Sequence, residues 1–222
     1  MTGTPSHPRL IDLIDNPIAP PSAAAAKSVL ADLKDLAADN PEIAECIARD
    51  TPARRFLTAA LALSPYLRDL ALSDPEALGR SLTHPVGDLV NAEIARARAC
   101  WRQADGALAS EAEVMTALRR AKRQVAMAVA LADLARIITC YETTRFLSDL
   151  ADASLGAAFD HLLSSDHAAG KFTLHDTDNP GQGSGLVVLG MGKHGAGELN
   201  YSSDIDIVVF FEAEAGIVAD PQ

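Results

Sequence analysis

The feature that most constrains the fold of this sequence is a short segment near its C-terminal end, in which two apolar runs flank a loop rich in glycine. The runs cover Leu186–Leu189 and Ile205–Phe211, and a turn-rich stretch precedes the first. Short apolar runs bounded by turn residues are typical of buried β-strands. The loop between them carries most of the polar groups and has room for one helical turn. The segment therefore predicts two strands joined by a glycine turn.

The rest of the sequence predicts a mostly helical region. Residues 1–21 form a proline-rich lead-in, residues 22–165 are rich in Ala and Leu, and residues 166–184 form a turn-rich linker before the strand segment of residues 185–222. Helix start signals recur through the Ala- and Leu-rich part. They are a capping serine at Ser22, the pairs Thr51-Pro52 and Asp74-Pro75, and a capping box from Ser110 to Glu113. We expect helices over residues 22–38, 110–141 and 144–163.

Two common phosphate-binding motifs fit the glycine loop poorly. Residues Gly190–Gly195 match the dinucleotide pattern G-x-G-x-x-G. That pattern also needs an acidic residue about twenty positions further on, at the end of the next strand. Here the carboxylates of Asp204 and Asp206 come earlier, at the start of the next strand. A Walker loop is excluded because Lys193 is followed by His194 rather than by Ser or Thr.

A carboxylate pair at the start of the second strand indicates a different chemistry. Residues two apart on a strand share a face, so Asp204 and Asp206 should present two carboxylates side by side, with Ile205 and Ile207 in the core. Adjacent carboxylates repel unless a cation joins them, and their hard oxygens suit Mg²⁺. With glycines that let backbone N–H groups approach a phosphate, and with hydroxyls nearby, the pair predicts a metal-dependent nucleotidyltransferase. The alternative is an exposed strand start with two solvated aspartates.

The stretch from Leu189 to Ile207 closely resembles the signature of the bifunctional glutamine synthetase adenylyltransferase/adenylyl-removing enzymes. It reads LGMGKHGAGELNYSSDIDI. Weaker likeness covers Leu118–Leu134 and Leu147–Asp152, which look like the helical region before the family's first catalytic core. The resemblance implies a helical region followed by the start of an α/β nucleotidyltransferase core of the DNA polymerase β-like type. Because the motif lies behind Met1 and a helical region, it resembles the N-terminal copy, the adenylyl-removing half.

That family's activity implies a role for each polar residue of the motif. The adenylyl-removing half takes AMP from a tyrosine of adenylylated glutamine synthetase by phosphorolysis, which gives ADP. Asp204 and Asp206 would be the catalytic residues that hold Mg²⁺. The residues implied to bind nucleotide and phosphate are Gly190, Gly192, Lys193, Ser202 and Ser203. Glu198 and Asn200 would orient the loop or the nucleotide.

The resemblance also implies partners and a truncation. Glutamine synthetase would be the protein substrate, and a PII-type signalling protein and glutamine would be regulators. The core needs a third carboxylate on a later strand, and residues 213–222 are too few to supply it. We therefore expect an N-terminal fragment that is inactive on its own, with an apolar edge exposed at Phe210 and Phe211.

The net charge and the cysteine content indicate which classes of partner and which cellular compartment to expect. The chain has 222 residues and a net charge of −11, which argues against nucleic-acid and membrane partners because both need a surplus of Lys and Arg. Cys46, Cys100 and Cys140 are widely spaced and odd in number, which predicts buried thiols in a reducing cytoplasm. Two alternatives stay open. One is a helical interaction module that binds glutamine synthetase or a regulator, and the other is a different nucleotidyltransferase.

Overall fold

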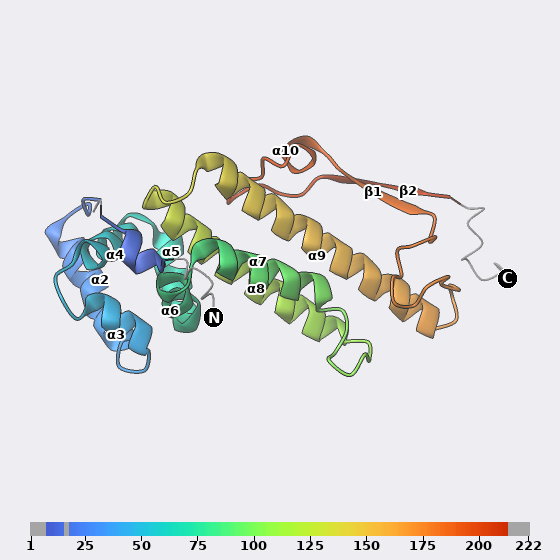
Figure 1. Ribbon diagram of the computed structural model, residues 1–222, viewed down its shortest axis with the longest axis horizontal. Coiled ribbons are helices and arrows are strands. Elements are labelled where there is room, and N and C mark those ends of the chain that lie inside the picture. Colours follow the sequence, from blue (N-terminus) through green and yellow to red (C-terminus); the bar gives the residue numbers. More distant parts are fainter. Residues whose placement is uncertain (1–7, 16–17, 213–222) are drawn as a thin grey trace, which may run out of the picture. The chain divides into compact units, whose positions relative to one another are not determined.

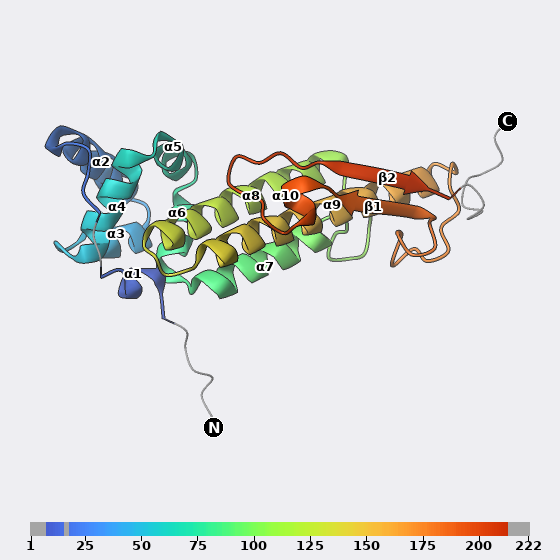
Figure 2. The same cartoon turned by 90° about the horizontal axis from the view of Figure 1, so that it is seen from above.

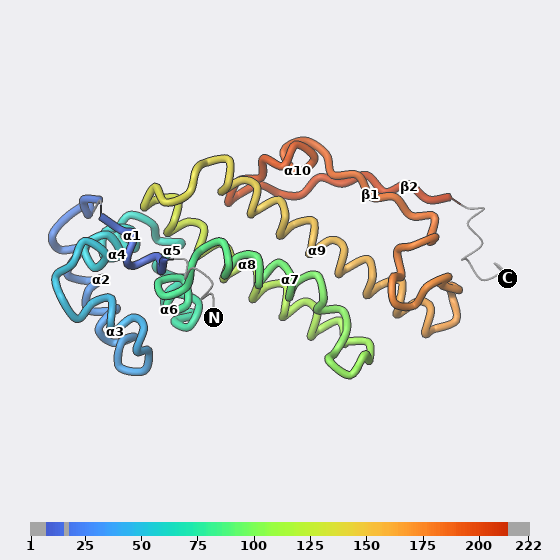
Figure 3. Tube along the Cα trace, viewed as in Figure 1, coloured from blue at the N-terminus to red at the C-terminus, as the bar shows by residue number. Residues whose placement is uncertain are grey.

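The computed structural model describes residues 8–15 and 18–212, which form helices and one short β-hairpin (Figure 1). The chain divides into two compact units. One contains Met1–Glu93 and Arg123–Thr143, and the other contains Ile94–Lys122 and Thr144–Gln222. Three helices, at residues 86–99, 111–134 and 140–168, contribute residues to both units, and the course of the chain can be followed by its colour from blue to red in Figure 3.

The helices of the described chain follow one another with short connections (Figure 1). Their bounds are α1 Leu10–Leu13, α2 Ala23–Leu36, α3 Pro41–Ile47, α4 Pro52–Leu63, α5 Pro65–Ser73, α6 Pro75–Thr83, α7 Val86–Ala99, α8 Glu111–Leu134 and α9 Cys140–Ala168.

Proline-headed helices give the first unit its short connections. Helices α3, α4, α5 and α6 each begin at a proline, and the side chain just before it accepts a hydrogen bond from the backbone N–H three residues on. The predicted caps Thr51 and Asp74 are confirmed, at 3.2 and 3.0 Å. Asn40 and Ser64 act in the same way. Proline at the first helical position costs no hydrogen bond, because that N–H has no partner inside the helix.

The helix expected over residues 110–141 is shorter than predicted, because α8 ends at Leu134 and residues 140–141 already belong to α9. The capping box that starts it is confirmed, since the N–H of Ser110 donates to the Glu113 carboxylate at 2.7 Å. Helix α8 ends at Leu134, where Arg136 adopts a left-handed conformation with φ of 58°. The N–H of Ile137 then donates to the carbonyl of Ala132, which is the hydrogen bond of a Schellman helix end.

A second capping box starts α9 directly after that break. The Glu142 carboxylate accepts from the N–H of Thr139 at 2.8 Å, and the N–H of Glu142 donates to the Thr139 hydroxyl at 3.2 Å. Helix α9 therefore begins four residues earlier than predicted, and it runs to Ala168 rather than to Leu163. The sequence signal is the T-x-x-E pattern from Thr139 to Glu142.

The core of the first unit is made by apolar faces of its helices. Val29, Leu33, Ile43, Phe56 and Leu57 have at most 1% of their surface exposed. The cysteines differ from one another. Burial raises the pKa of the Cys46 thiol to about 12, whereas Cys100 is half-buried and Cys140 is exposed, so the prediction of buried thiols is confirmed for Cys46 and wrong for Cys140. That residue stands at the first position of α9.

Candidate functional site

The candidate site lies in the second unit, where a hairpin and a glycine turn sit along α9 (Figures 1 and 2). Strand β1 spans Leu186–Gly190 and pairs in antiparallel fashion with β2, Ile207–Phe211. The register places Leu186 opposite Phe211 and Gly190 opposite Ile207. The first predicted strand is confirmed, and the second starts two residues later than expected.

The later start of β2 changes how the aspartates are placed. Asp204 and Asp206 precede the strand in a segment without regular structure, so strand alternation does not order them. Ile205 and Ile207 are 41% and 36% exposed, so the prediction that they enter the core is wrong. Within the described residues β2 pairs with β1 alone, and a two-stranded ribbon is too narrow to enclose its own apolar side chains.

The glycine turn brings the two strand ends together. One helical turn, α10 at Gly192–Gly195, follows β1 and confirms the turn expected in the loop. The backbone N–H of Met191 donates to the carbonyl of Asp206 at 2.8 Å, which fixes the start of α10 beside the aspartates. Gly195 must lack a side chain, because a Cβ there would overlap the carbonyl oxygen of Gly190. Gly192 has φ of 53°, a conformation that glycine adopts readily.

A cavity of about 300 Å³ opens beside this turn and gathers most of the predicted polar residues. Its lining consists of Lys193, Asn200, Ser202, Ser203, Asp204 and Asp206. Asp204 and Asp206 are both exposed to solvent, and each turns toward a space that also holds a lysine and two hydroxyls. Residues that are up to thirteen positions apart in the sequence therefore share one polar cavity.

Asn200 organises the hydroxyl side of the cavity. Its side-chain oxygen accepts from the Ser203 hydroxyl at 2.9 Å and from the N–H of Ser202 at 3.1 Å. The N–H of Asn200 in turn donates to the Ser203 hydroxyl at 3.2 Å. These bonds hold the two serines in a tight turn next to the aspartates.

Three of the sequence-predicted residues do not line the cavity. Gly192 is outside the lining but close to it, since a Cβ there would stand 3.9 Å from the Asp206 carboxylate. Gly190 faces the other side of the turn, where the His194 ring lies. Glu198 is exposed, and its N–H donates to the carbonyl of Lys193 at 2.7 Å.

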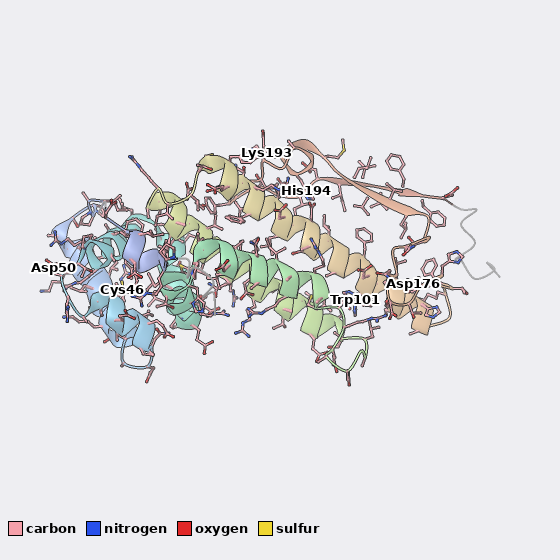
Figure 4. All side chains as sticks on the ribbon, in the orientation of Figure 1. Cys46, Asp50, Trp101, Asp176, Lys193 and His194 are labelled. Carbon is pink, nitrogen blue, oxygen red and sulfur yellow. The ribbon has the colours of Figure 1, made fainter. Side chains whose placement is uncertain are left out.

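Sequence reasoning missed three residues that hold the turn on α9. His194 is buried, and its Nε2 lies 2.8 Å from Oδ1 of Asp152. The hydroxyl of Ser148 accepts from the N–H of Leu199 at 3.2 Å. Ser148 and Asp152 both belong to the Leu147–Asp152 stretch, so the stretch itself was the available signal. Figure 4 labels Lys193 and His194, the adjacent residues of α10.

The donor set of the cavity suits a small hard cation together with a phosphate. Two carboxylates, two hydroxyls and an amide oxygen are oxygen ligands of the kind Mg²⁺ prefers, and Lys193 adds a positive charge. Across residues 8–15 and 18–212, no cluster of three or more His, Cys, Asp or Glu side chains is suited to holding a metal. Asp204 and Asp206 are the two acidic residues in the lining of the cavity. Nor does any helix in the described parts of the chain have the length and apolar character to cross a membrane.

A glycine turn that sets a carboxylate pair beside a lysine and hydroxyls is an arrangement suited to handling phosphate groups. The family model described as glutamate-ammonia ligase adenylyltransferase matches residues 55–220. The chain belongs to this family, which is a family of nucleotidyltransferases.

Similar curated proteins carry the name bifunctional glutamine synthetase adenylyltransferase/adenylyl-removing enzyme. The one from Agrobacterium fabrum is 50% identical over 213 residues, which is 96% of this chain and 22% of that protein. The one from Rhizobium meliloti is 52% identical over 204 residues, 91% of this chain and 21% of that protein. The chain thus spans about a fifth of the length of these relatives. No solved structure matches it.

Proposed function

We propose that this chain belongs to the adenylyl-removing half of an enzyme that controls glutamine synthetase, and that it begins the core that removes AMP from an adenylylated tyrosine. The observation that carries the proposal is the polar cavity, which sets the Asp204 and Asp206 carboxylates beside Lys193 and two hydroxyls. The names of the relatives support glutamine synthetase as the protein substrate.

The reaction we propose is phosphorolysis. An oxygen of inorganic phosphate forms a bond to the AMP phosphorus, and the bond from that phosphorus to the tyrosyl oxygen breaks. The tyrosyl oxygen takes up a proton, and the products are ADP and the free tyrosine side chain. Mg²⁺, when bound, would neutralise charge on the phosphate oxygens and stabilise the departing oxygen.

The chain's own residues divide this work between binding and orientation. Asp204 and Asp206 would hold Mg²⁺ through their exposed carboxylates. Lys193 would offset phosphate charge, and the Gly192 backbone would approach the phosphate closely because no side chain intervenes. Asn200 would act through the serines, since its side-chain oxygen holds both of them in place.

Some residues of the motif would support the site from its edges. Ser202 and Ser203 would donate hydroxyl hydrogen bonds to phosphate oxygens. Gly190 would shape the turn, and Glu198 would orient the loop through its backbone bond to Lys193. We also propose a cytoplasmic location, and a PII-type signalling protein and glutamine as regulators of the whole enzyme.

The test is ADP formation from adenylylated glutamine synthetase, Mg²⁺ and inorganic phosphate. It compares the 222-residue chain, a longer chain extended through the region that the relatives contain, and that longer chain carrying Asp204→Asn. We expect ADP from the longer chain, at least about a 100-fold loss with Asp204→Asn, and little or no turnover from the 222-residue chain.

Glu212→Gln in the longer chain is the matched control. Glu212 is an exposed carboxyl at the other end of β2 and does not line the cavity. This variant should keep normal turnover. A well-folded longer chain that forms no ADP would instead favour the helical interaction module, which binds glutamine synthetase or a regulator without chemistry.

A further inference from the structure

The one-turn helix α10 has two faces with different surroundings. Lys193 is exposed and lines the polar cavity with the aspartates. His194, the next residue, is buried on the opposite side, and only 3% of its side chain is exposed. Two adjacent residues of α10 thus have very different exposures.

The His194 ring is held between α9 and the end of β1. Its Nε2 lies 2.8 Å from Oδ1 of Asp152, so Nε2 carries the hydrogen and donates it to the carboxylate. The ring also packs on Gly190, where an added Cβ would stand 3.1 Å from Nδ1. Nδ1 itself is buried with no hydrogen-bond partner. One hydrogen bond to a residue 42 positions away therefore fixes the ring.

A helix as short as α10 needs such a tether. The turn is closed by four backbone bonds, in which the N–H groups of Gly195, Ala196, Gly197 and Glu198 donate to the carbonyls of Met191, Gly192, His194 and Lys193, respectively. A single turn of helix is unstable in water, because fixing its backbone costs more than so few bonds return. Its stability must come from tertiary contacts.

Helix α9 supplies two tethers, one at each end of the segment from Lys193 to Leu199. Asp152 holds His194 at the start, and Ser148 accepts from the N–H of Leu199 at the end. Residues four apart lie on the same face of a helix, so both tethers come from one face of α9. The helix acts as a rigid support along which the loop is laid.

We propose that Asp152 and His194 are a positioning pair, which holds α10 so that Lys193 and the Gly192 backbone face the Asp204 and Asp206 carboxylates. This inference rests on the proposed function in one respect, namely that the cavity binds phosphate. Neither residue touches the cavity, so the pair acts through the turn it holds. The Asp152 side chain is 65% exposed, whereas that of His194 is 3% exposed.

The test uses the 222-residue chain with two readouts. The first is amide hydrogen exchange measured residue by residue. Asp152→Ala and His194→Phe, which keeps a ring but has no N–H to donate, should each speed exchange at Gly195, Ala196 and Glu198 at least about tenfold, and leave α4 and the first turns of α9 unchanged. The double variant should be no worse than either single variant, because both remove the same bond.

The second readout separates phosphate binding from metal binding. Mn²⁺ is titrated alone by electron paramagnetic resonance, and inorganic phosphate is then titrated into the Mn²⁺-loaded chain. Asp152→Ala and His194→Phe should weaken phosphate binding about tenfold, since orienting partners commonly contribute tenfold or more. Mn²⁺ affinity should stay within about twofold, because neither residue lines the cavity with the carboxylates that would hold the metal. Asp152→Asn keeps an acceptor oxygen and should restore most of both readouts.

Asp166→Asn is the matched control on the same helix. Asp166 forms an exposed ion pair with Lys171, remote from the turn, and should leave both readouts at wild-type values. Wild-type exchange and phosphate affinity in Asp152→Ala would overturn the positioning pair. So would faster exchange throughout the chain, because that result assigns the pair to general stability. Failure of wild-type Mn²⁺ binding would count against the proposed function alone, since the exchange result still decides on the pair.

Discussion

Phe56 and Phe210 are the same residue type in opposite surroundings. Phe56 on α4 is 1% exposed within a unit of helices whose apolar faces cover one another. Phe210 on β2 is 55% exposed, as are most apolar residues of the hairpin. The helical unit gains its stability from the burial of such residues, whereas the hairpin holds its shape mainly through backbone pairing and tethers to α9. Stability and the candidate chemistry are therefore carried by different parts of the chain.

The largest expected effect on stability comes from removing the Phe56 ring. Phe56→Ala should lower the free energy of unfolding by about 3–5 kcal/mol, because it leaves a cavity in a closed core. Phe210→Ala should change it by less than about 1 kcal/mol, because the ring already contacts solvent. Urea denaturation followed by circular dichroism measures both. Equal losses would show that the hairpin is as well packed as the helices.

Two glycines extend the comparison between the helices and the hairpin segment. Replacing them tests how closely other atoms approach the backbone, rather than how much apolar surface is buried. Gly195→Ala should cost about 1–3 kcal/mol, because the new Cβ would overlap the Gly190 carbonyl and the turn would have to open. Gly156→Ala, inside α9, has nothing within 4 Å of the new Cβ and should stabilise by about 0.5–1 kcal/mol. Thermal unfolding of the two variants checks both signs. A neutral Gly195→Ala would mean that the turn tolerates a wider spacing.

Local signals in the sequence predicted the starts of helices better than their ends. Caps such as Thr51 and Ser110 were found because a side chain and its partner lie three residues apart. The end of α8 was missed because the left-handed residue there is Arg136, not the glycine that usually marks such an end.

In the candidate site too, features that depend on neighbouring residues were easier to predict than contacts between distant parts of the sequence. The residues that line the cavity all lie in one loop, from Lys193 to Asp206, so the glycine-loop pattern and the family resemblance were enough to select them, and their roles stay a prediction. The bond between Asp152 and His194 spans 42 residues, and no local pattern reports a contact at that separation. The exposure of Ile205 and Ile207 was missed because burial of a strand depends on neighbours outside its own sequence.

The second capping box tests whether the break between α8 and α9 is set locally. Thr139→Ala removes the hydroxyl that accepts from Glu142 and should cost about 1 kcal/mol. Ser110→Ala, at the start of α8, is the matched variant and should cost a similar amount, since the geometry of the two boxes is the same. Chemical denaturation at neutral pH measures the pair. A much larger loss for Thr139→Ala would show that the break also depends on tertiary contacts.

The smallest expected effect is on the pH dependence of stability, through the capping box of Thr139 and Glu142. The backbone N–H and the hydroxyl of Thr139 donate to the Glu142 carboxylate and hold its pKa below the ordinary value of 4.5. A carboxyl whose pKa is lowered by folding stabilises the folded state above its unfolded pKa, and this contribution is lost as the pH falls through the folded pKa. Glu142→Gln should therefore lose less stability than wild type between about pH 6 and pH 3, as thermal unfolding across that range would show. Parallel curves would mean that the carboxylate is bound no more tightly in the folded chain than in the unfolded one, and that the Thr139 hydroxyl is the effective half of the box.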